Sequence, residues 1–243
     1  MNDTARLAAE NVTVSFGQRR VLYEVTLHVG RGETVGLRGP SGSGKSTLAR
    51  VLALLRRPDS GQVHLDGAPV TAARHRVPAL VRTRVALLFQ SPRAAADPRL
   101  SLADLIAEPL RATGADRSHT RRQVAELAER VGLTADLLTR RSHAVSDGQL
   151  QRACLARALA QKPDYLLCDE ATAMLDASTQ AQVAHVITDY QREHNIGVLL
   201  ITHDPALMTR WADRVDHLPT IAGMPEALPV QQDRRLLSET RQL

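Results

Sequence analysis

Residues 39–47, GPSGSGKST, constrain the fold more than any other part of this sequence. They fit the pattern G-x-x-x-x-G-K-[ST], they follow the apolar run GETVGLR, and they precede a stretch with helical periodicity. The glycines allow the backbone to curl so that consecutive N–H groups point at phosphate oxygens, and the following helix adds the positive end of its dipole. The segment therefore predicts a phosphate-binding loop between a strand and a helix.

Lysine is rare in this chain, since Lys45 and Lys162 are the only lysines among 31 Lys and Arg residues. Position 45 favours an ammonium over a guanidinium because a compact charge fits inside a closed loop and reaches between the β- and γ-phosphates of a nucleotide. Ser46 is expected to ligate Mg²⁺. The loop residues predicted to bind the nucleotide are Gly39, Pro40, Ser41, Gly42, Ser43, Gly44, Lys45, Ser46 and Thr47.

The segment YLLCDE, residues 165–170, is an apolar run that ends in two acids. It predicts a buried strand with Asp169 at its tip, where the carboxylate can hold Mg²⁺ through water. Glu170 is then a candidate general base that polarises the attacking water. Such a pair of acids can also be structural or can cap a helix, but a phosphate loop in the same chain favours the catalytic interpretation.

Short apolar runs alternate with longer helical patterns along the chain. Strands are predicted at 11–16, 32–38, 61–67, 84–89, 165–170 and 197–204. Helices are predicted at 45–55, 101–112, 121–132, 148–161 and 178–194. This alternation predicts an α/β core with a mainly parallel sheet.

The domain prediction is a single domain over residues 1–243. Residues 1–89 and 143–217 are expected to form the catalytic core, and the mainly helical segment 90–142 interrupts the alternation as an inserted lobe. Residues 218–243 are rich in Pro and charge and are expected to form a poorly defined tail.

The composition limits the classes of function. A hydrophobic fraction of 43% is enough for a globular core, and the net charge of +5 would permit contact with nucleic acid or anionic lipid. The arginines are scattered among acids, as in RRQVAELAER, which favours a solvated surface, and no nucleic acid partner is expected. The N-terminus is polar, the apolar runs are too short to cross a bilayer, and the two cysteines do not have CxxC spacing. These features favour a cytoplasmic chain with at most a peripheral membrane role.

Over roughly residues 7–217 the sequence resembles the ATP-binding subunits of ABC transporters. The motifs follow the family's order: the phosphate loop, Gln90 after VALLF, VSDGQLQRACLARAL as the signature helix, CDEATAMLD, and LLITHD. The resemblance implies a P-loop NTPase core of the ABC ATPase type, with a small antiparallel β subdomain beside the parallel sheet and the helical lobe. It also implies ATP and Mg²⁺ as the bound nucleotide and metal.

The resemblance further implies roles for single residues. Gln90 would touch Mg²⁺ and the membrane partner, His203 would contact the γ-phosphate, Asp176 would lie at a dimer interface, and Phe16 would stack on adenine. Each has a plainer alternative. Phe16 can be a core aromatic, Gln90 an ordinary loop residue and His203 a structural histidine at the end of a buried strand.

The signature departs from the family's usual Leu-Ser-Gly-Gly-Gln. Here the four residues after Val145 are Ser146, Asp147, Gly148 and Gln149. In the family this segment binds the γ-phosphate of ATP held by the opposite subunit. Asp147 places a carboxylate near that phosphate, and two anions at close range repel unless the carboxylate turns outward. Its alternative role is to cap and stabilise the start of the helix.

A narrower resemblance, in LLFQSPRAAADPRLSLADLIAEPLR, is to the peptide and nickel importer branch of these ATPases. The longer members of that branch carry a cysteine-rich tail that this sequence does not show. It implies an ATP-hydrolysing subunit at the cytoplasmic face of the membrane. The implied partners are a second ATPase subunit, either a copy or a homologue, the permease subunits, and an extracytoplasmic solute-binding protein. Two alternatives remain at this point: a catalytically silent half of a heterodimer, and a non-transport ATPase that acts on DNA or ribosomes.

Overall fold

The computed structural model describes residues 5–172 and 175–219. The strands are β1 (Arg6–Phe16), β2 (Arg19–Gly30), β3 (Thr34–Arg38), β4 (Ser60–Leu65), β5 (Ala68–Val70), β6 (Val85–Leu88), β7 (Tyr165–Asp169), β8 (Gly197–Ile201) and β9 (Arg214–His217). The α-helices are α1 (Lys45–Leu52), α2 (Ala79–Arg82), α3 (Pro92–Ala95), α4 (Leu102–Ala112), α5 (Arg117–Arg130), α6 (Ala135–Leu138), α7 (Asp147–Leu159), α8 (Ala177–His194) and α9 (Pro205–Trp211). Two short 3₁₀ helices are η1 (Arg74–Arg76) and η2 (Ser142–Ala144).

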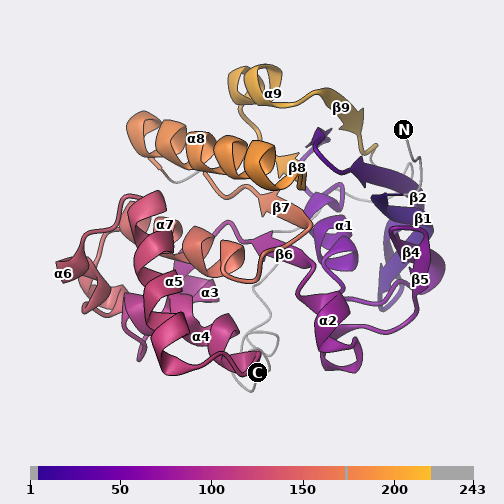
Figure 1. The fold of residues 1–243 in the computed structure, drawn as a ribbon. Helices are drawn as coiled ribbons and strands as arrows, with labels where there is room; N and C mark the ends of the chain where they lie inside the picture. Colours follow the sequence, from indigo (N-terminus) through magenta and orange to yellow (C-terminus); the bar gives the residue numbers. More distant parts are fainter. Residues whose placement is uncertain (1–4, 173–174, 220–243) are drawn as a thin grey trace.

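Within the described ranges the strands form two sheets. One is parallel, with strand order β6-β7-β8-β3-β9, and the other is antiparallel, with order β2-β1-β4-β5. Helix α1 lies between the two sheets, and the helices α3 to α7 gather on the far side of the molecule from the antiparallel sheet (Figure 1). The predicted α/β fold with a parallel sheet and a smaller antiparallel sheet is confirmed.

The parallel sheet is apolar on both faces, as a sheet covered by helices on both sides must be. In β7 the side chains alternate between two cores: Leu166 and Cys168 pack with α4, α5, α7 and α8, whereas Tyr165 and Leu167 pack with α1 and the antiparallel sheet. Burial of these alternating positions requires the strand to be covered on each face. The continuous apolar run YLLC is therefore the expected sequence of such a strand.

Two elements differ from the sequence prediction at the antiparallel sheet and at α1. Strand β2 was not predicted, because its apolar alternation is interrupted at Tyr23 and Glu24. Glu24 takes a φ of 51°, and the register with β1 shifts next to it. Helix α1 ends at Leu52 rather than near residue 55. Leu54 adopts a φ of 60°, and the next two N–H groups return to the carbonyl of Arg50.

Further differences lie in the helical lobe and near the predicted tail, and the short elements β5, α2, α3, α6 and α9 were not predicted from the sequence. Helices α3 to α6 follow β6 and precede α7, and α4 packs against both α5 and α7. Strand β9 forms within DRVDH and pairs with β3. It was not predicted from the sequence, because its side chains alternate between partly buried and exposed and show no apolar pattern. The predicted tail lies outside the described residues from residue 220 onward.

A charged network joins the two sheets at the amino-terminal edge of the parallel sheet. Asp66, in the turn between β4 and β5, accepts hydrogen bonds from Tyr165 Oη (2.6 Å), Arg31 Nη2 (3.0 Å) and Arg84. Both arginines also bond Asp164. Burial alone would raise the pKa of the Asp66 carboxyl, but the hydrogen bonds from these three partners hold it below its ordinary value. The network therefore clamps the antiparallel sheet onto the core.

Replacing Tyr165 by Phe tests this clamp. The variant leaves the buried ring in place but removes the hydroxyl that donates to Asp66, so the free energy of unfolding should fall by about 1–3 kcal/mol. Urea unfolding followed by circular dichroism measures the change. Tyr190→Phe is the matched control, because the hydroxyl of this equally buried ring reaches its acceptor, the Leu159 carbonyl, only at 3.5 Å. An equal loss in both variants would contradict the proposed clamp.

Candidate functional site

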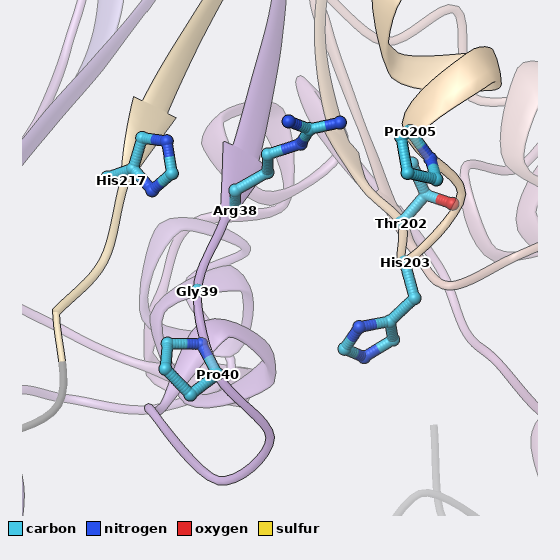
Figure 2. Close-up of a pocket in the computed structure, with 7 residues that line it drawn as sticks. All are labelled: Arg38, Gly39, Pro40, Thr202, His203, Pro205 and His217. Atoms are coloured by element: carbon cyan, nitrogen blue, oxygen red, sulfur yellow. The ribbon is translucent and has the colours of Figure 1, made fainter.

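The predicted phosphate-loop, metal and catalytic residues meet at one edge of the parallel sheet. Strands β3, β6, β7 and β8 run in the same direction, so the segments that follow them leave the sheet at the same edge. These segments carry the phosphate loop after β3, Gln90 after β6, Glu170 after β7 and His203 after β8. Figure 2 shows the loop at Gly39 and Pro40 on one side and His203 on the other.

The phosphate loop is closed by its own lysine. Lys45 is buried, and its Nζ donates to the carbonyls of Gly39 and Pro40, each at 2.8 Å. Burial lowers the pKa of Lys45, while the carboxylates of Glu170 and Asp169 act in the opposite direction. The ammonium thus bonds the backbone at the start of its own loop, and its predicted contact with the nucleotide phosphates stays a prediction.

Two further features of the loop fit a phosphate group. Gly44 has a φ of 99°, and a Cβ there would lie 2.9 Å from the carbonyl oxygen of Val21, so β2 packs closely against the loop. Ser43 Oγ is buried and has no hydrogen-bond partner within the described residues. A buried hydroxyl without a partner is costly, and a phosphate oxygen would supply the missing acceptor.

Ser46 and Asp169 form a hard-oxygen pair beside the loop. Ser46 Oγ donates to Asp169 Oδ1 at 2.9 Å, and burial raises the pKa of the Asp169 carboxyl. A bound cation would favour the ionised form of this carboxyl and offset the effect of burial. A hydroxyl and a carboxylate at this spacing are ligands that Mg²⁺ prefers, so the residues present fit the predicted metal.

Glu170 is held by the other two predicted catalytic residues. Gln90 Nε2 donates to Glu170 Oε2 at 2.7 Å, and His203 Nε2 lies 2.9 Å from Glu170 Oε1. Glu170 itself adopts a φ of 50°, and its N–H bonds the carbonyl of Ile201 at 3.0 Å. A left-handed glutamate is strained and persists only where its surroundings fix it. The geometry therefore fixes the carboxylate between the amide and the imidazole.

A hollow of about 340 Å³ opens beside His203 and the start of the phosphate loop (Figure 2). It is lined by Arg38, Gly39, Pro40, Thr202, His203, Pro205 and His217. Sequence reasoning gave no role to Arg38, although it directly precedes the loop, or to His217, which only the pairing of β9 with β3 brings here. The hollow leaves open space next to the imidazole.

The signature segment forms a capped helix start. Ser146 Oγ accepts from the N–H of Gln149 at 3.2 Å, and the Gln149 side chain accepts from the N–H of Ser146 at 3.0 Å. This reciprocal pair is a capping box. Asp147 lies in the first turn of α7 but does not cap it, since its Oδ1 is 2.6 Å from Arg93 Nε. Of the two predicted roles for Asp147, capping is thus taken by Ser146, and the carboxylate instead pairs with an arginine.

Asp176 and Phe16 lie at the surface. Asp176 caps α8 by accepting from the N–H of Thr179 at 2.9 Å, and a Cβ on Gly148 would lie 3.1 Å from Thr179 Cγ2, so the signature and the start of α8 are adjacent. Phe16 is 47% exposed, and Arg56 Cζ lies 3.8 Å from its ring centroid. Phe16 is therefore not a core aromatic, and adenine stacking remains a prediction for it.

The family model described as "ABC transporter" matches residues 22–173. The chain is 40% identical over 198 residues to the nickel import ATP-binding protein NikE of Brucella suis biovar 1 (strain 1330), covering 81% of this chain and 74% of that protein. It is 42% identical to a putative peptide import ATP-binding protein of Brucella abortus (strain 2308), covering 81% of this chain and 59% of that protein. The chain belongs to the ABC transporter family.

Solved structures agree with this assignment. The dimeric structure of MJ0796, a bacterial ABC transporter cassette, superposes with a TM-score of 0.79 at 26% identity, covering 88% of this chain and 94% of that one. A post-hydrolysis state of MJ0796 bound to ADP and Pi gives a TM-score of 0.78 at 27% identity, covering 87% and 94%. The predicted ABC-type fold and ATPase class are confirmed, whereas the roles of individual residues stay predictions.

Lys45→Ala tests the phosphate loop. Loss of the buried ammonium should lower ATP affinity by roughly a hundredfold or more, because charge-assisted bonds to the phosphates are lost. Isothermal calorimetry measures the affinity, and a thermal melt checks that the fold is intact. Lys162→Ala is the matched control, because Lys162 is the other lysine and is exposed in the turn between α7 and β7. Tight ATP binding by Lys45→Ala would contradict the assignment of the loop.

Proposed function

We propose that this chain is the ATP-hydrolysing subunit of a membrane importer for peptide, nickel or a similar small solute. The observation that carries the proposal is the placement of Glu170 between Gln90 and His203, next to a loop closed by Lys45. The similarity to proteins named for nickel and peptide import supports the choice of solute.

In the proposed reaction the phosphate loop binds ATP first. Lys45 exchanges the carbonyls of Gly39 and Pro40 for phosphate oxygens, and Ser43 Oγ gains the acceptor that it lacks within the described residues. Backbone N–H groups at the start of α1 complete the cradle. Mg²⁺ held by Ser46, Asp169 and Gln90 would neutralise charge on the β- and γ-phosphate oxygens.

Glu170 then acts as the general base. Water attacks the γ-phosphorus, the bond from that phosphorus to the β,γ-bridging oxygen breaks, and the proton of the water passes to the Glu170 carboxylate. Gln90 and His203 each engage one Glu170 oxygen, and each oxygen keeps a lone pair that can accept the proton. His203, released towards the γ-phosphate, stabilises the charge that develops there.

The proposed assembly contains two ATPase subunits that enclose two ATP molecules head to tail. Ser146, Gly148 and the N–H groups at the start of α7 bind the γ-phosphate held by the partner, and Asp176 lies at the interface. The partner is a copy of this chain or a homologue. Within residues 5–172 and 175–219, no helix is long and apolar enough to span a bilayer. We propose that the chain lies at the cytoplasmic face of the membrane and binds permease subunits, to which a solute-binding protein delivers the solute.

Glu170→Gln tests the catalytic proposal. The amide cannot accept a proton, so the ATPase rate should fall at least about a hundredfold while ATP affinity is retained. Phosphate release at saturating Mg-ATP measures the rate, and chelation of Mg²⁺ should stop hydrolysis by the unmodified protein. Glu126→Gln, an exposed position on α5, serves as the control. An unchanged rate in Glu170→Gln would instead support a catalytically silent subunit.

Uptake by cells tests the transport proposal. Cells that carry Glu170→Gln in place of the unmodified chain should lose uptake of radioactive nickel or of labelled short peptides, because the permease then lacks its driving reaction. Each solute is measured separately, with uptake of an unrelated amino acid as the control. Normal uptake of both solutes would overturn the proposed importer class.

A further inference from the structure

Arg93 makes three contacts with the segment that leads into the signature. It is the second residue of α3 and lies three positions after Gln90. Its Nη1 donates to the Ser142 carbonyl and its Nη2 to the Val145 carbonyl, each at 3.1 Å, and its Nε lies 2.6 Å from Asp147 Oδ1. A single guanidinium therefore holds the backbone before the signature and the carboxylate within it.

Other contacts tie the same short segment to α7. Gln151 Nε2 donates to the Phe89 carbonyl at 3.4 Å, and Arg157 Nη1 donates to the Ala95 carbonyl at 3.3 Å. The residues on both sides of Gln90 and Arg93 are thus fastened to α7. Arg157 also pairs with Glu108 at 2.8 Å, whereas Arg93 pairs with a charge that belongs to the signature itself.

The pairing changes the charge that an approaching anion meets. Asp147 stands between Ser146 and Gly148 in the first turn of α7, where N–H groups and the helix dipole favour an anion. An uncompensated carboxylate there would repel a phosphate and compete for the same donors. Paired with Arg93, the carboxylate is neutralised from the side of α3. The two side chains together present no net charge.

We propose that Arg93 is a positioning residue that neutralises Asp147 and thereby allows the signature of this chain to close over the γ-phosphate of ATP bound to a second copy. The inference rests on the proposed function, because it needs a partner that presents a nucleotide to α7. Arg93 acts through the charge of Asp147, and its bonds to the carbonyls of Ser142 and Val145 hold the guanidinium in place. Its removal impairs closure of the dimer, not nucleotide binding by the chain's own phosphate loop.

The pair has little effect on folding stability. Both side chains are 47% exposed, and ion pairs as exposed as this one add little to the stability of a fold. The energetic effect is concentrated in the closed dimer, where water is excluded and the carboxylate faces a polyphosphate. Nucleotide-dependent association is therefore the measurement that separates a charge role from a structural role.

The test uses Glu170→Gln as the parent, so that ATP is bound but not hydrolysed, and measures ATP-dependent dimerisation by sedimentation. Arg93→Gln should weaken the dimer roughly tenfold, because two unneutralised carboxylates then face two nucleotides. Asp147→Asn and the double variant Arg93→Gln with Asp147→Asn should dimerise like the parent.

Arg93→Lys keeps the charge and should dimerise nearly as well as the parent. Added salt should restore part of the Arg93→Gln dimer by screening the repulsion, but should not affect the double variant.

The matched control is Arg111→Gln, which breaks another exposed Arg–Asp pair, with Asp104 on α4, and should leave dimerisation unchanged. If the parent dimerises and Arg93→Gln dimerises equally well, the inference is overturned but the proposed function is not. An equal loss in Arg93→Gln and in the double variant would also overturn it, since Arg93 would then act only through the backbone. A parent that binds ATP but never dimerises would overturn self-pairing, and the inference with it.

Discussion

The parallel pairing of β6, β7, β8 and β3 is the constraint on which the rest of the structure depends. Because these strands share one direction, the residues that follow them meet at one edge, although they come from distant parts of the chain. Both faces of the sheet are buried by apolar side chains, so ionisable groups are placed at its ends. The chemistry of the site is therefore a consequence of strand order and direction.

At that edge the polar groups of the site bond to one another. Lys45 bonds two loop carbonyls, Ser46 bonds Asp169, and Glu170 is held by an amide and an imidazole. Each of these pairs satisfies a buried or partly buried group that would otherwise be costly. In the proposed reaction, ATP binding and hydrolysis proceed by exchange of these partners. The strained φ of Glu170 is part of this prepared geometry.

Stability and coupling lie in other parts of the molecule. The network of Asp66 with Tyr165, Arg31 and Arg84 joins the two sheets at the edge opposite the phosphate loop, away from the groups that exchange partners. Arg93 instead connects the segment after Gln90 to the signature. The fold thus separates the clamp that fixes the sheets from the contacts that, in the proposed dimer, link the site of one subunit to the surface facing its partner.

The sequence by itself determined the phosphate loop, the acid pair after β7 and the α/β class, because glycine spacing, the lysine of the loop and apolar runs act within short segments. It did not predict β2, whose alternation breaks at Glu24, or β9, which lacks an apolar pattern. Only the tertiary structure decided that Asp147 pairs with Arg93. Such pairings depend on how α3 packs against α7, and no local pattern of residues specifies a contact between segments that are distant in the chain.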